Sequence, residues 1–523
     1  MAVTIINFGK NLVFMAAQRL TPHSEEEVLD ILRTLRSRKI RVLGSLHSWS
    51  DVVRCDDVVL DLSRLCGVTV NDGPGGPPTV TAGAGCRIHA LLAALRRHSL
   101  TLPTLGAVTK QTIAGAVSTA THGSGKSSLS HYVRAIRIAT YNPETRQPFI
   151  LELGSDSPDK QAFRAARCSL GYLGVILSVT LECVPSYDVS ETLALVESLD
   201  DVLDPADDYP LQQFIVVPYA WKYYVFRRKV DDPSRPRGDL EWLCTRTYRA
   251  YKLVFVDIIL HGIVKVLAFL SCRWLTRLFY RGFPLVAFRF RGRTFTDTSE
   301  HSLTIRHDLY RHMEMEVFVP AKHIRKALRL VRHITELFAA GPGGTPLADD
   351  LRNTLRQIPG APAESCRNEG DSSHQPYVPA QCTDSILAEL YRSEGDYTHH
   401  YPIVCRRVHP DDALIAMTSG DSGDYYSVSF FTYRPGNPHF SKYCDYLARC
   451  LMHLYGARLH WGKYLPLTYD KAIVSKVYPE DHLKQFRQIC ARYDAGGVFQ
   501  NSYAQRVLGF PAPKSSGPDP LAW

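Results

Sequence analysis

Two loops made almost entirely of small residues limit what this chain can fold into more than any other feature, and each contains one histidine. The first loop is Gly44-Ser45-Leu46-His47-Ser48. The second is Ala114-Gly115-Ala116-Val117-Ser118-Thr119-Ala120-Thr121-His122-Gly123-Ser124-Gly125. Loops of Gly, Ser and Thr expose backbone N–H groups that can cradle a pyrophosphate. One such loop is common, but two in one unit predict a phosphate-bearing cofactor.

The residues around these loops alternate between short β runs and helical stretches. Ser24-Glu25-Glu26-Glu27 forms a capping box that predicts a helix through Arg38. Further strands are expected at 40–44, 58–62, 79–82 and 171–184, with a helix at 87–98. This is an α+β pattern without the regular β-α-β repetition of a dinucleotide fold. Gly83-Ala84-Gly85 fits either a phosphate loop or a tight turn.

The pattern changes after residue 185, which we take as the end of a first domain at 1–185. A second domain is expected at 186–470, and a C-terminal segment at 471–523 returns to the first domain. The expected strands of the second domain are 213–217, 223–228, 313–319, 403–408 and 425–433, and its expected helices are 322–337 and 440–455. A further helix is expected at 479–493, in the C-terminal segment. The run 341–379 is rich in Pro, Gly, Ser and Asp and predicts a flexible surface insertion.

A mostly aliphatic stretch at 253–272 is about long enough to span a membrane. However, Asp257, His261 and Lys265 recur every four residues, which places them on one helical face. The pattern favours an amphipathic helix that either lies on a membrane or covers a core. Basic and aromatic residues follow directly, so 247–283 is a candidate for peripheral membrane contact.

The charge balance excludes one class of partner and leaves another open. Lysines and arginines number 61 against 52 acidic residues, and they form no block of the kind that binds nucleic acid. The net charge of +9 suits an anionic ligand or surface. None of the 13 cysteines falls in a C-x-x-C pair, so we expect reduced thiols, no metal site and an intracellular protein.

The order of these motifs resembles the flavoproteins of the vanillyl-alcohol-oxidase type, specifically the sugar-1,4-lactone oxidases that end vitamin C synthesis. The resemblance rests on Asn7-Phe8, the two loops, the run 102–125, Ser169-Leu170-Gly171-Tyr172-Leu173-Gly174-Val175-Ile176, His460-Trp461-Gly462-Lys463 and the terminal residues 494–509. It implies an α+β fold, in which a two-part FAD-binding domain carries an α+β cap domain for the substrate. An eukaryotic member would lie at an endoplasmic reticulum or mitochondrial membrane.

The resemblance implies FAD as cofactor, covalently attached through His47 to the 8α-methyl group of the isoalloxazine. Leu46 stands where many relatives have glycine. The positions that match the family's cofactor contacts are Gly44, Ser45, Leu46, His47, Ser48, Gly115, Ser118, Thr121, His122, Gly123, Ser124, Gly174, Val175, Ile176 and His460.

The implied reaction oxidises a sugar-1,4-lactone at C2 and gives ascorbate or an analogue. The hydride passes to flavin N5, and Arg406 and Lys463 would stabilise the negative charge that builds on the substrate oxygen. Thr112 matches a hydroxyl position near the flavin. Gly106 matches the small residue that leaves room for molecular oxygen, which implies hydrogen peroxide as the second product.

One departure from the family pattern leaves the function open. The family's Pro-x-Glu-x-Arg element reads Pro402-Ile403-Val404-Cys405-Arg406, so a valine replaces the substrate-facing carboxylate. Losing a buried acceptor costs about 1–3 kcal/mol. Glu316 is either a substitute carboxylate or a structural residue. The alternatives are a lactone or alditol dehydrogenase that uses a cytochrome, and a catalytically impaired flavin-binding protein.

Overall fold

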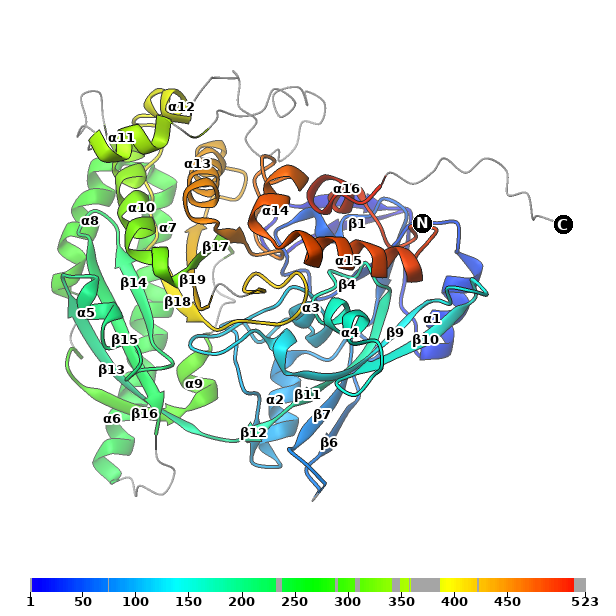
Figure 1. Ribbon diagram of the computed structural model, residues 1–523. Coiled ribbons are helices and arrows are strands. Elements are labelled where there is room, and N and C mark those ends of the chain that lie inside the picture. Colours follow the sequence, from blue (N-terminus) through cyan, green and yellow to red (C-terminus); the bar gives the residue numbers. More distant parts are fainter. Residues whose placement is uncertain are drawn as a thin grey trace.

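The computed structural model describes residues 2–73, 75–231, 238–286, 290–305, 311–340, 349–356, 358, 386–420 and 423–511. Figure 1 shows two regions side by side, one built mainly from the N-terminal third of the chain and one around a large sheet. Of the predicted insertion at 341–379, only α11 (Asp349–Arg356) and Ile358 are described, and the rest lies outside the described residues.

The first region combines three small sheets with helices between them. Its hairpin pairs β1 (Val3–Ile6) with β2 (Val13–Ala16), and its parallel sheet has the order β3 (Gln18–Leu20), β5 (Val58–Asp61), β4 (Ile40–Leu43). The antiparallel sheet has the order β10 (Pro148–Gly154), β9 (Val133–Tyr141), β11 (Val175–Glu182), β7 (Thr79–Gly83), β6 (Val68–Asn71). The helices are α1 (Glu25–Thr34), α2 (Ile88–Arg96), α3 (Ile113–Ser118) and α4 (Lys160–Arg167).

Helix α1 begins where the capping box predicts. The side chain of Ser24 accepts a hydrogen bond from the backbone N–H of Glu27, and acidic residues fill the first turn. Val28 and Leu32, one turn apart, are fully buried. Local sequence therefore sets this helix and the face that it buries.

The second region is built on an eight-stranded antiparallel sheet. Its order is β16 (Thr294–Thr298), β13 (Asp188–Val196), β15 (Lys222–Val230), β14 (Gln213–Val217), β18 (Ile403–Val408), β19 (Tyr425–Thr432), β17 (Met313–Pro320), β20 (Arg458–Leu459). Helices α10 (Ile324–Ala339) and α13 (Pro438–Tyr455) cover one face. A short strand pair links the regions, β8 (Leu100–Thr101) with β12 (Val184–Pro185). The described residues therefore confirm the predicted α+β fold.

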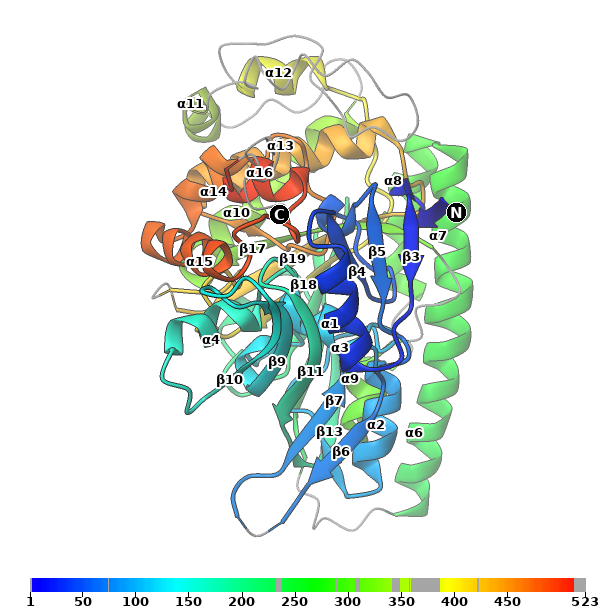
Figure 2. The ribbon, with the colours of Figure 1, turned by 90° about the vertical axis from the view of Figure 1, so that its right-hand side faces the viewer.

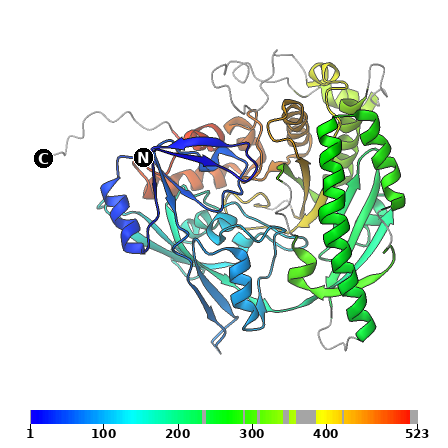
Figure 3. The ribbon, with the colours of Figure 1, turned by 180° about the vertical axis from the view of Figure 1, so that it is seen from behind.

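A long helical hairpin lies along the second region. It consists of α6 (Asp239–Tyr251), the π-helical segment η3 (Lys252–Leu260) and α7 (His261–Leu270), followed by α8 (Arg273–Val286). Figures 2 and 3 show it as a green column at the edge of the molecule. Among the described residues, Glu241–Leu270 is the one helical run long and apolar enough to cross a membrane.

The C-terminal helices α14 (Lys471–Val477), α15 (Glu480–Tyr493) and α16 (Ser502–Leu508) return the chain to the first region. The backbone N–H of Ile40 donates to the Val498 carbonyl at 2.8 Å, and Lys39 Nζ donates to the Gly497 carbonyl at 2.6 Å. Asn501 Nδ2 donates to three carbonyls of residues 51–54. The N-terminal parallel sheet and the C-terminus therefore form one structural unit.

Candidate active site

The two small-residue loops meet at a cavity of about 410 Å³. Its wall contains the first loop, the start of α3, the turn before β11 and the segment after β20. The residues predicted from the sequence that line it are Gly44, Ser45, Leu46, His47, Ser48, Thr112, Gly115, Ser118, Gly174, Ile176, His460 and Lys463. Segments more than 400 residues apart in the chain thus share one cavity.

Glycines are required here because the two loops approach each other closely. A Cβ atom on Gly44 would lie 2.6 Å from Thr112 Oγ1, and one on Gly115 would lie 3.0 Å from the same atom. The Thr112 hydroxyl therefore sits between the loops. A Cβ on Gly85, which also lines the cavity, would lie 1.9 Å from the Leu62 carbonyl oxygen, so close packing accounts for that glycine.

The first loop presents its backbone to the cavity. The amides of Ser45, Leu46 and Ser48 donate to no group among the residues that the structure describes. Leu46 adopts a left-handed conformation with φ of 57°, which costs a non-glycine residue about 1–2 kcal/mol. This conformation explains why glycine suits the position. Donor amides and glycine-sized gaps fit a phosphate-bearing cofactor such as FAD.

Sequence analysis missed Arg41, the buried cation in the cavity wall. Its guanidinium donates to the carbonyls of Val52, Leu170, Gly171 and Phe499 at 2.5–3.1 Å. Burial lowers the pKa of Arg41. Its Nε atom has no hydrogen-bond partner within the described ranges. No sequence signal could have found Arg41, because its partners come from three distant segments.

The His47 side chain is held by an aromatic cluster. Its ring lies 4.9 Å from the Phe8 ring, and Phe8 also contacts Trp49 and His312. Trp49 Nε1 donates to the His312 carbonyl at 2.8 Å. The ammonium of Lys463 lies 4.7 Å from the centre of the Trp49 ring. The packing fixes the histidine and the lysine on the same side of the cavity.

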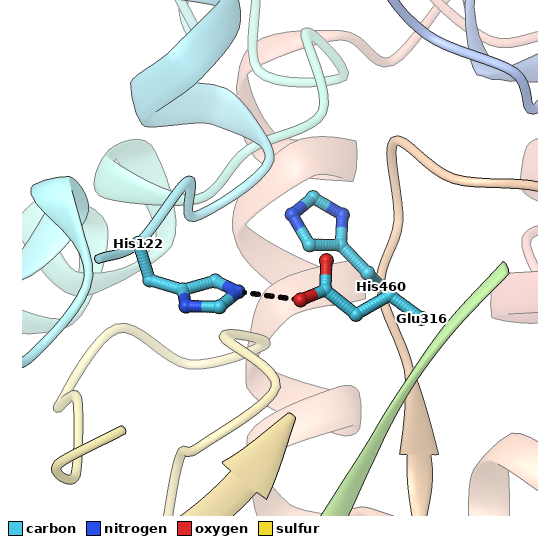
Figure 4. Close-up of side chains that lie close together, drawn as sticks. All are labelled: His122, Glu316 and His460. Atoms are coloured by element: carbon cyan, nitrogen blue, oxygen red, sulfur yellow. Dashed lines mark hydrogen bonds and ion pairs between the residues drawn. The ribbon is translucent and has the colours of Figure 1, made fainter. Parts of the chain in front are cut away.

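Two carboxylates on β17 lie behind this cavity wall. Glu314 and Glu316 are two residues apart, so both side chains lie on one face of the strand. Lys463 Nζ donates to Glu314 Oε2, and His122 Nε2 lies 3.1 Å from Glu316 Oε1. Figure 4 shows the second contact, with the His460 ring beside the same carboxylate. Each carboxylate therefore has its own cationic or imidazole partner.

The two carboxylates differ in electrostatics. Burial raises the pKa of Glu314. The charge of Glu316 raises this pKa further, and the charge of Lys463 lowers it. Burial also raises the pKa of Glu316, but the charge and hydrogen bond of His122 outweigh it and hold the pKa well below its usual range. Glu316 is therefore a stable anion, whereas Glu314 takes up a proton more readily.

The hydrogen bonds of the two histidines define their proton positions. His122 Nδ1 lies 2.9 Å from the Gly123 carbonyl, so it must carry a proton, and its Nε2 atom faces the carboxylate. His460 Nδ1 accepts from the Gly462 N–H at 3.0 Å, and burial lowers the pKa of His460 to about 3. His460 is then neutral with its proton on Nε2. The ligand atoms of His122, Glu316 and His460 lie within 4.8 Å of one another, but this Nε2 proton makes His460 a donor rather than a metal ligand.

Several predicted residues lie away from the cavity. After α3 the second loop runs to the large sheet, where the Gly125 N–H donates to the Arg407 carbonyl at 2.7 Å. The cavity is therefore not lined by Thr121, His122, Gly123 or Ser124. A Cβ on Gly106 would lie 2.8 Å from Thr121 Cγ2. Val175 begins β11 and pairs with Ala139.

Arg406 extends from β18 on the other side of the site. Its Nε donates to Gln213 Oε1 at 3.0 Å. Burial lowers the pKa of Arg406, and the charges of Glu316 and Glu314 act in the opposite direction. Arg406 therefore belongs to the electrostatic environment of the two carboxylates, although it does not line the cavity.

Strand register places Val404 in one row with Glu316. Directly opposite residues share a face in an antiparallel sheet. Across successive strands the row is Tyr224, Ile215, Val404, Ser429, Glu316. Ile215 and Val404 are only partly buried, unlike Phe214 and Cys405 on the opposite face. The row is polar at Glu316 and apolar beyond Ser429.

The comparisons with known proteins agree with this architecture. Residues 16–146 match the FAD binding domain family, and residues 377–507 match the D-arabinono-1,4-lactone oxidase family. A long-chain alcohol oxidase from an uncultured marine euryarchaeote is 39% identical over 96% of both chains. L-gulonolactone oxidase from Bos taurus is 25% identical over 93% of this chain and 94% of its own.

Two further matches extend the comparison. L-gulono-1,4-lactone dehydrogenase from Mycobacterium tuberculosis is 28% identical over 93% of this chain and 95% of its own. The crystal structure of cholesterol oxidase from B. sterolicum has the same fold, with a TM-score of 0.67 at 16% identity over 98% of this chain and 97% of its own. The chain therefore belongs to the FAD-dependent oxidases of the vanillyl-alcohol-oxidase type that carry a D-arabinono-1,4-lactone oxidase domain.

Proposed function

We propose that this protein oxidises a long-chain aliphatic alcohol to the aldehyde, with molecular oxygen reduced to hydrogen peroxide. The row that runs from Glu316 through Ser429 to Val404 and Ile215 carries the proposal. A hydroxyl group suits its polar end, and an alkyl chain suits the apolar end. The 39% identical relative, which is a long-chain alcohol oxidase, supports this substrate class.

The cavity wall would hold the FAD. The amides of the first loop suit its pyrophosphate, and Gly44 and Gly115 leave room beside Thr112. When bound, FAD supplies the hydride acceptor for alcohol oxidation and passes the electrons on to oxygen. We also propose that His47, in the first loop, forms the covalent link to the flavin, since its ring is held at the cavity wall by Phe8.

The chain's own groups would manage charge and the proton. Lys463 and His460 line the cavity, and their N–H groups can donate to the substrate oxygen as negative charge builds on it. Lys463 Nζ donates to Glu314 Oε2, and this contact suits charge stabilisation rather than proton removal. Burial raises the pKa of Glu314, so this carboxylate is the better-matched acceptor for the hydroxyl proton.

A sugar-1,4-lactone is the second candidate substrate, oxidised at C2 to ascorbate or an analogue. The match of residues 377–507 to the D-arabinono-1,4-lactone oxidase family favours it, as do Arg406 and Lys463. Against it, Val404 offers no hydrogen bond to the sugar hydroxyls, and an unpaired polar group costs about 1–3 kcal/mol.

A substrate panel separates these functions. The purified protein is mixed without oxygen with 1-decanol, L-gulono-1,4-lactone or D-arabinono-1,4-lactone, and bleaching of the flavin absorbance is followed. We expect rapid bleaching by decanol and peroxide formation after air is admitted. Bleaching by the lactones alone would replace the proposal with the second candidate. Reoxidation by cytochrome c but not by oxygen would indicate a dehydrogenase, and no bleaching by any compound would indicate an impaired protein.

The covalent link is tested separately by acid precipitation. We expect the yellow colour to stay in the protein pellet and to move to the supernatant in His47→Ala. His89→Ala, which alters an exposed histidine of α2, is the matched control and should retain the colour. Colour released from the wild type would refute the link at His47 without affecting the proposed substrate.

A further inference from the structure

The helical hairpin α6–α8 exposes an unusual amount of apolar surface. Most of the large apolar side chains that are exposed among the described residues belong to it: Trp242, Leu243, Val254, Ile258, Ile259, Ile263, Val266, Phe269, Leu270, Trp274 and Leu278. Phe269 and Trp274, at the turn between α7 and α8, are 79% and 67% exposed. An apolar face of this extent marks an interaction surface.

The opposite side of the same hairpin is fixed to the protein along its whole length. Tyr248 Oη donates to Glu191 Oε1 at 2.6 Å, and His261 Nε2 lies 3.0 Å from Tyr401 Oη. At the turn, Arg434 donates to Ser271 Oγ at 2.6 Å. Val264, Leu267 and Ala268 form the buried face of α7. The hairpin therefore lies flat against the second region rather than projecting from it.

This attachment argues against a membrane-spanning role. A spanning helix meets lipid on all sides, so α6 and α7 would have to leave the protein. Their departure would uncover Glu191, which is 2% exposed and ion-paired to buried Arg228 beneath Tyr248. Their departure would also take away the Tyr248 hydrogen bond to this buried carboxylate, which is unfavourable. A helix that rests on a membrane keeps these contacts and still buries its outer face.

The charges of the hairpin favour an anionic lipid surface over another protein. Residues 239–286 contain seven arginines and lysines against three acidic residues, and of the seven, Arg249 and Lys252 are paired with Asp297 and Glu191 of the second region. Arg246 stacks on Trp242 at 5.1 Å near one end, and Arg273 precedes Trp274 at the other. Tryptophans beside basic residues are typical of the headgroup layer, where the ring is amphipathic and the cation meets phosphate.

We propose that the outer face of α6–α8 docks on an anionic lipid bilayer, with the helices parallel to the membrane plane. This inference does not depend on the proposed function, because membrane binding is measured without turnover. It does place the apolar end of the substrate row close to the lipid. Tyr224, at the apolar end of that row, packs in one cluster with Tyr248 and Tyr251 of α6.

The test is sedimentation of the full chain with vesicles of phosphatidylcholine and phosphatidylglycerol. We expect binding that weakens at high salt and in vesicles of phosphatidylcholine alone. Phe269→Glu combined with Trp274→Glu should reduce binding at least about tenfold, since two inserted apolar side chains are lost. Ile6→Glu combined with Met15→Glu is the matched control, because those residues are 50% and 60% exposed on the N-terminal hairpin, and it should bind like the wild type.

Two measurements keep the inference falsifiable. Thermal unfolding must show that both double variants fold as the wild type does, which exposed positions allow. Bound protein should be released from the vesicles by alkaline carbonate, as a peripheral protein is. Resistance to carbonate would replace docking with spanning. Failure to bind vesicles would refute the proposal, as would a dimer in solution that the Phe269 and Trp274 changes dissociate.

Discussion

The two sides of the candidate active site are built by opposite means. On the side of the first region, Gly44, Gly115 and the amides of the first loop form the wall, and the backbone is the working surface. On the side of the eight-stranded sheet, the candidate site consists of side chains outside the cavity wall, such as Glu316 and Val404, that strand register places in one row. One side depends on the absence of side chains and the other on their identity.

This difference separates the part of the site that would hold the cofactor from the part that would select the substrate. The loops that form the backbone wall can change little without losing the cofactor. A Cβ atom on Gly44 or Gly115 would crowd the Thr112 hydroxyl. A side-chain wall can be altered at one position while the strand keeps its hydrogen bonds. Substitutions in the loops should therefore affect FAD retention, whereas substitutions in the sheet should affect rate and substrate choice.

The largest effect is expected on the sheet side, in Glu314→Gln. If Glu314 accepts the hydroxyl proton, flavin reduction should slow by on the order of a thousandfold while FAD stays bound. Because burial raises the pKa of Glu314, the wild-type rate should fall as the pH drops through a value above the usual carboxylate range. The variant should lack this acid limb. An unchanged pH profile in stopped-flow measurements would remove Glu314 from the mechanism.

The loop side should respond differently in Gly44→Ala. The new methyl would lie 2.6 Å from Thr112 Oγ1, which a β-branched side chain cannot easily move. In a His47→Ala background, where the flavin is held without a covalent link, we expect FAD affinity to fall by up to about a hundredfold, as overpacking of this kind costs about 1–3 kcal/mol. Adding Thr112→Ala should recover binding. Gly67→Ala, with open space around its Cβ, is the control, and equal FAD affinity in all variants would contradict the cradle.

Substrate choice should shift at Val404 without loss of FAD. Val404→Glu puts a carboxylate in the row beside Ser429, so kcat/KM for decanol should fall and that for the lactones should rise, each by about tenfold. Val404→Thr keeps the shape and adds only a hydroxyl, so it should change the ratio less. If the ratio stays constant in both variants, the row does not contact the substrate.

The smallest effect is expected at Gly106, and it should be confined to reoxidation. A methyl at Gly106 would meet Thr121 Cγ2 at 2.8 Å. Gly106→Ala should slow the reaction of the reduced flavin with oxygen and leave flavin reduction unchanged. Thr121→Ser removes that methyl, so the double variant distinguishes crowding of Thr121 from obstruction of oxygen. Stopped-flow mixing with aerated buffer measures both, and unchanged reoxidation in Gly106→Ala would exclude Gly106 from the route of oxygen.

The sequence predicts the elements well where the signal is local. The expected strands at 213–217 and 403–408 match β14 and β18, and α1 begins at its capping box. The hairpin of β9 and β10 was missed, although both strands are clear in the structure. The first loop, Thr112, His460 and Lys463 could be placed together through the family resemblance.

The remaining parts of the site depend on long-range geometry. The contact of His122 with Glu316 joins residues 194 positions apart, and the row through Val404 follows from register across five strands. A one-residue slip would move Val404 to the opposite face, and no local pattern excludes that slip. Arg41 was missed for the same reason, since its role follows from carbonyls that tertiary folding collects around it.

The return of the C-terminus to the first region has a consequence for the order of folding. Lys39 and Arg41 reach carbonyls 458 residues later in the chain, and Asn501 secures residues 51–54 beside the cavity. Such contacts close only after almost the whole polypeptide has left the ribosome, and contacts of long sequence separation form slowly. FAD therefore has no finished site on the nascent chain, and loading of the cofactor follows synthesis instead of guiding it.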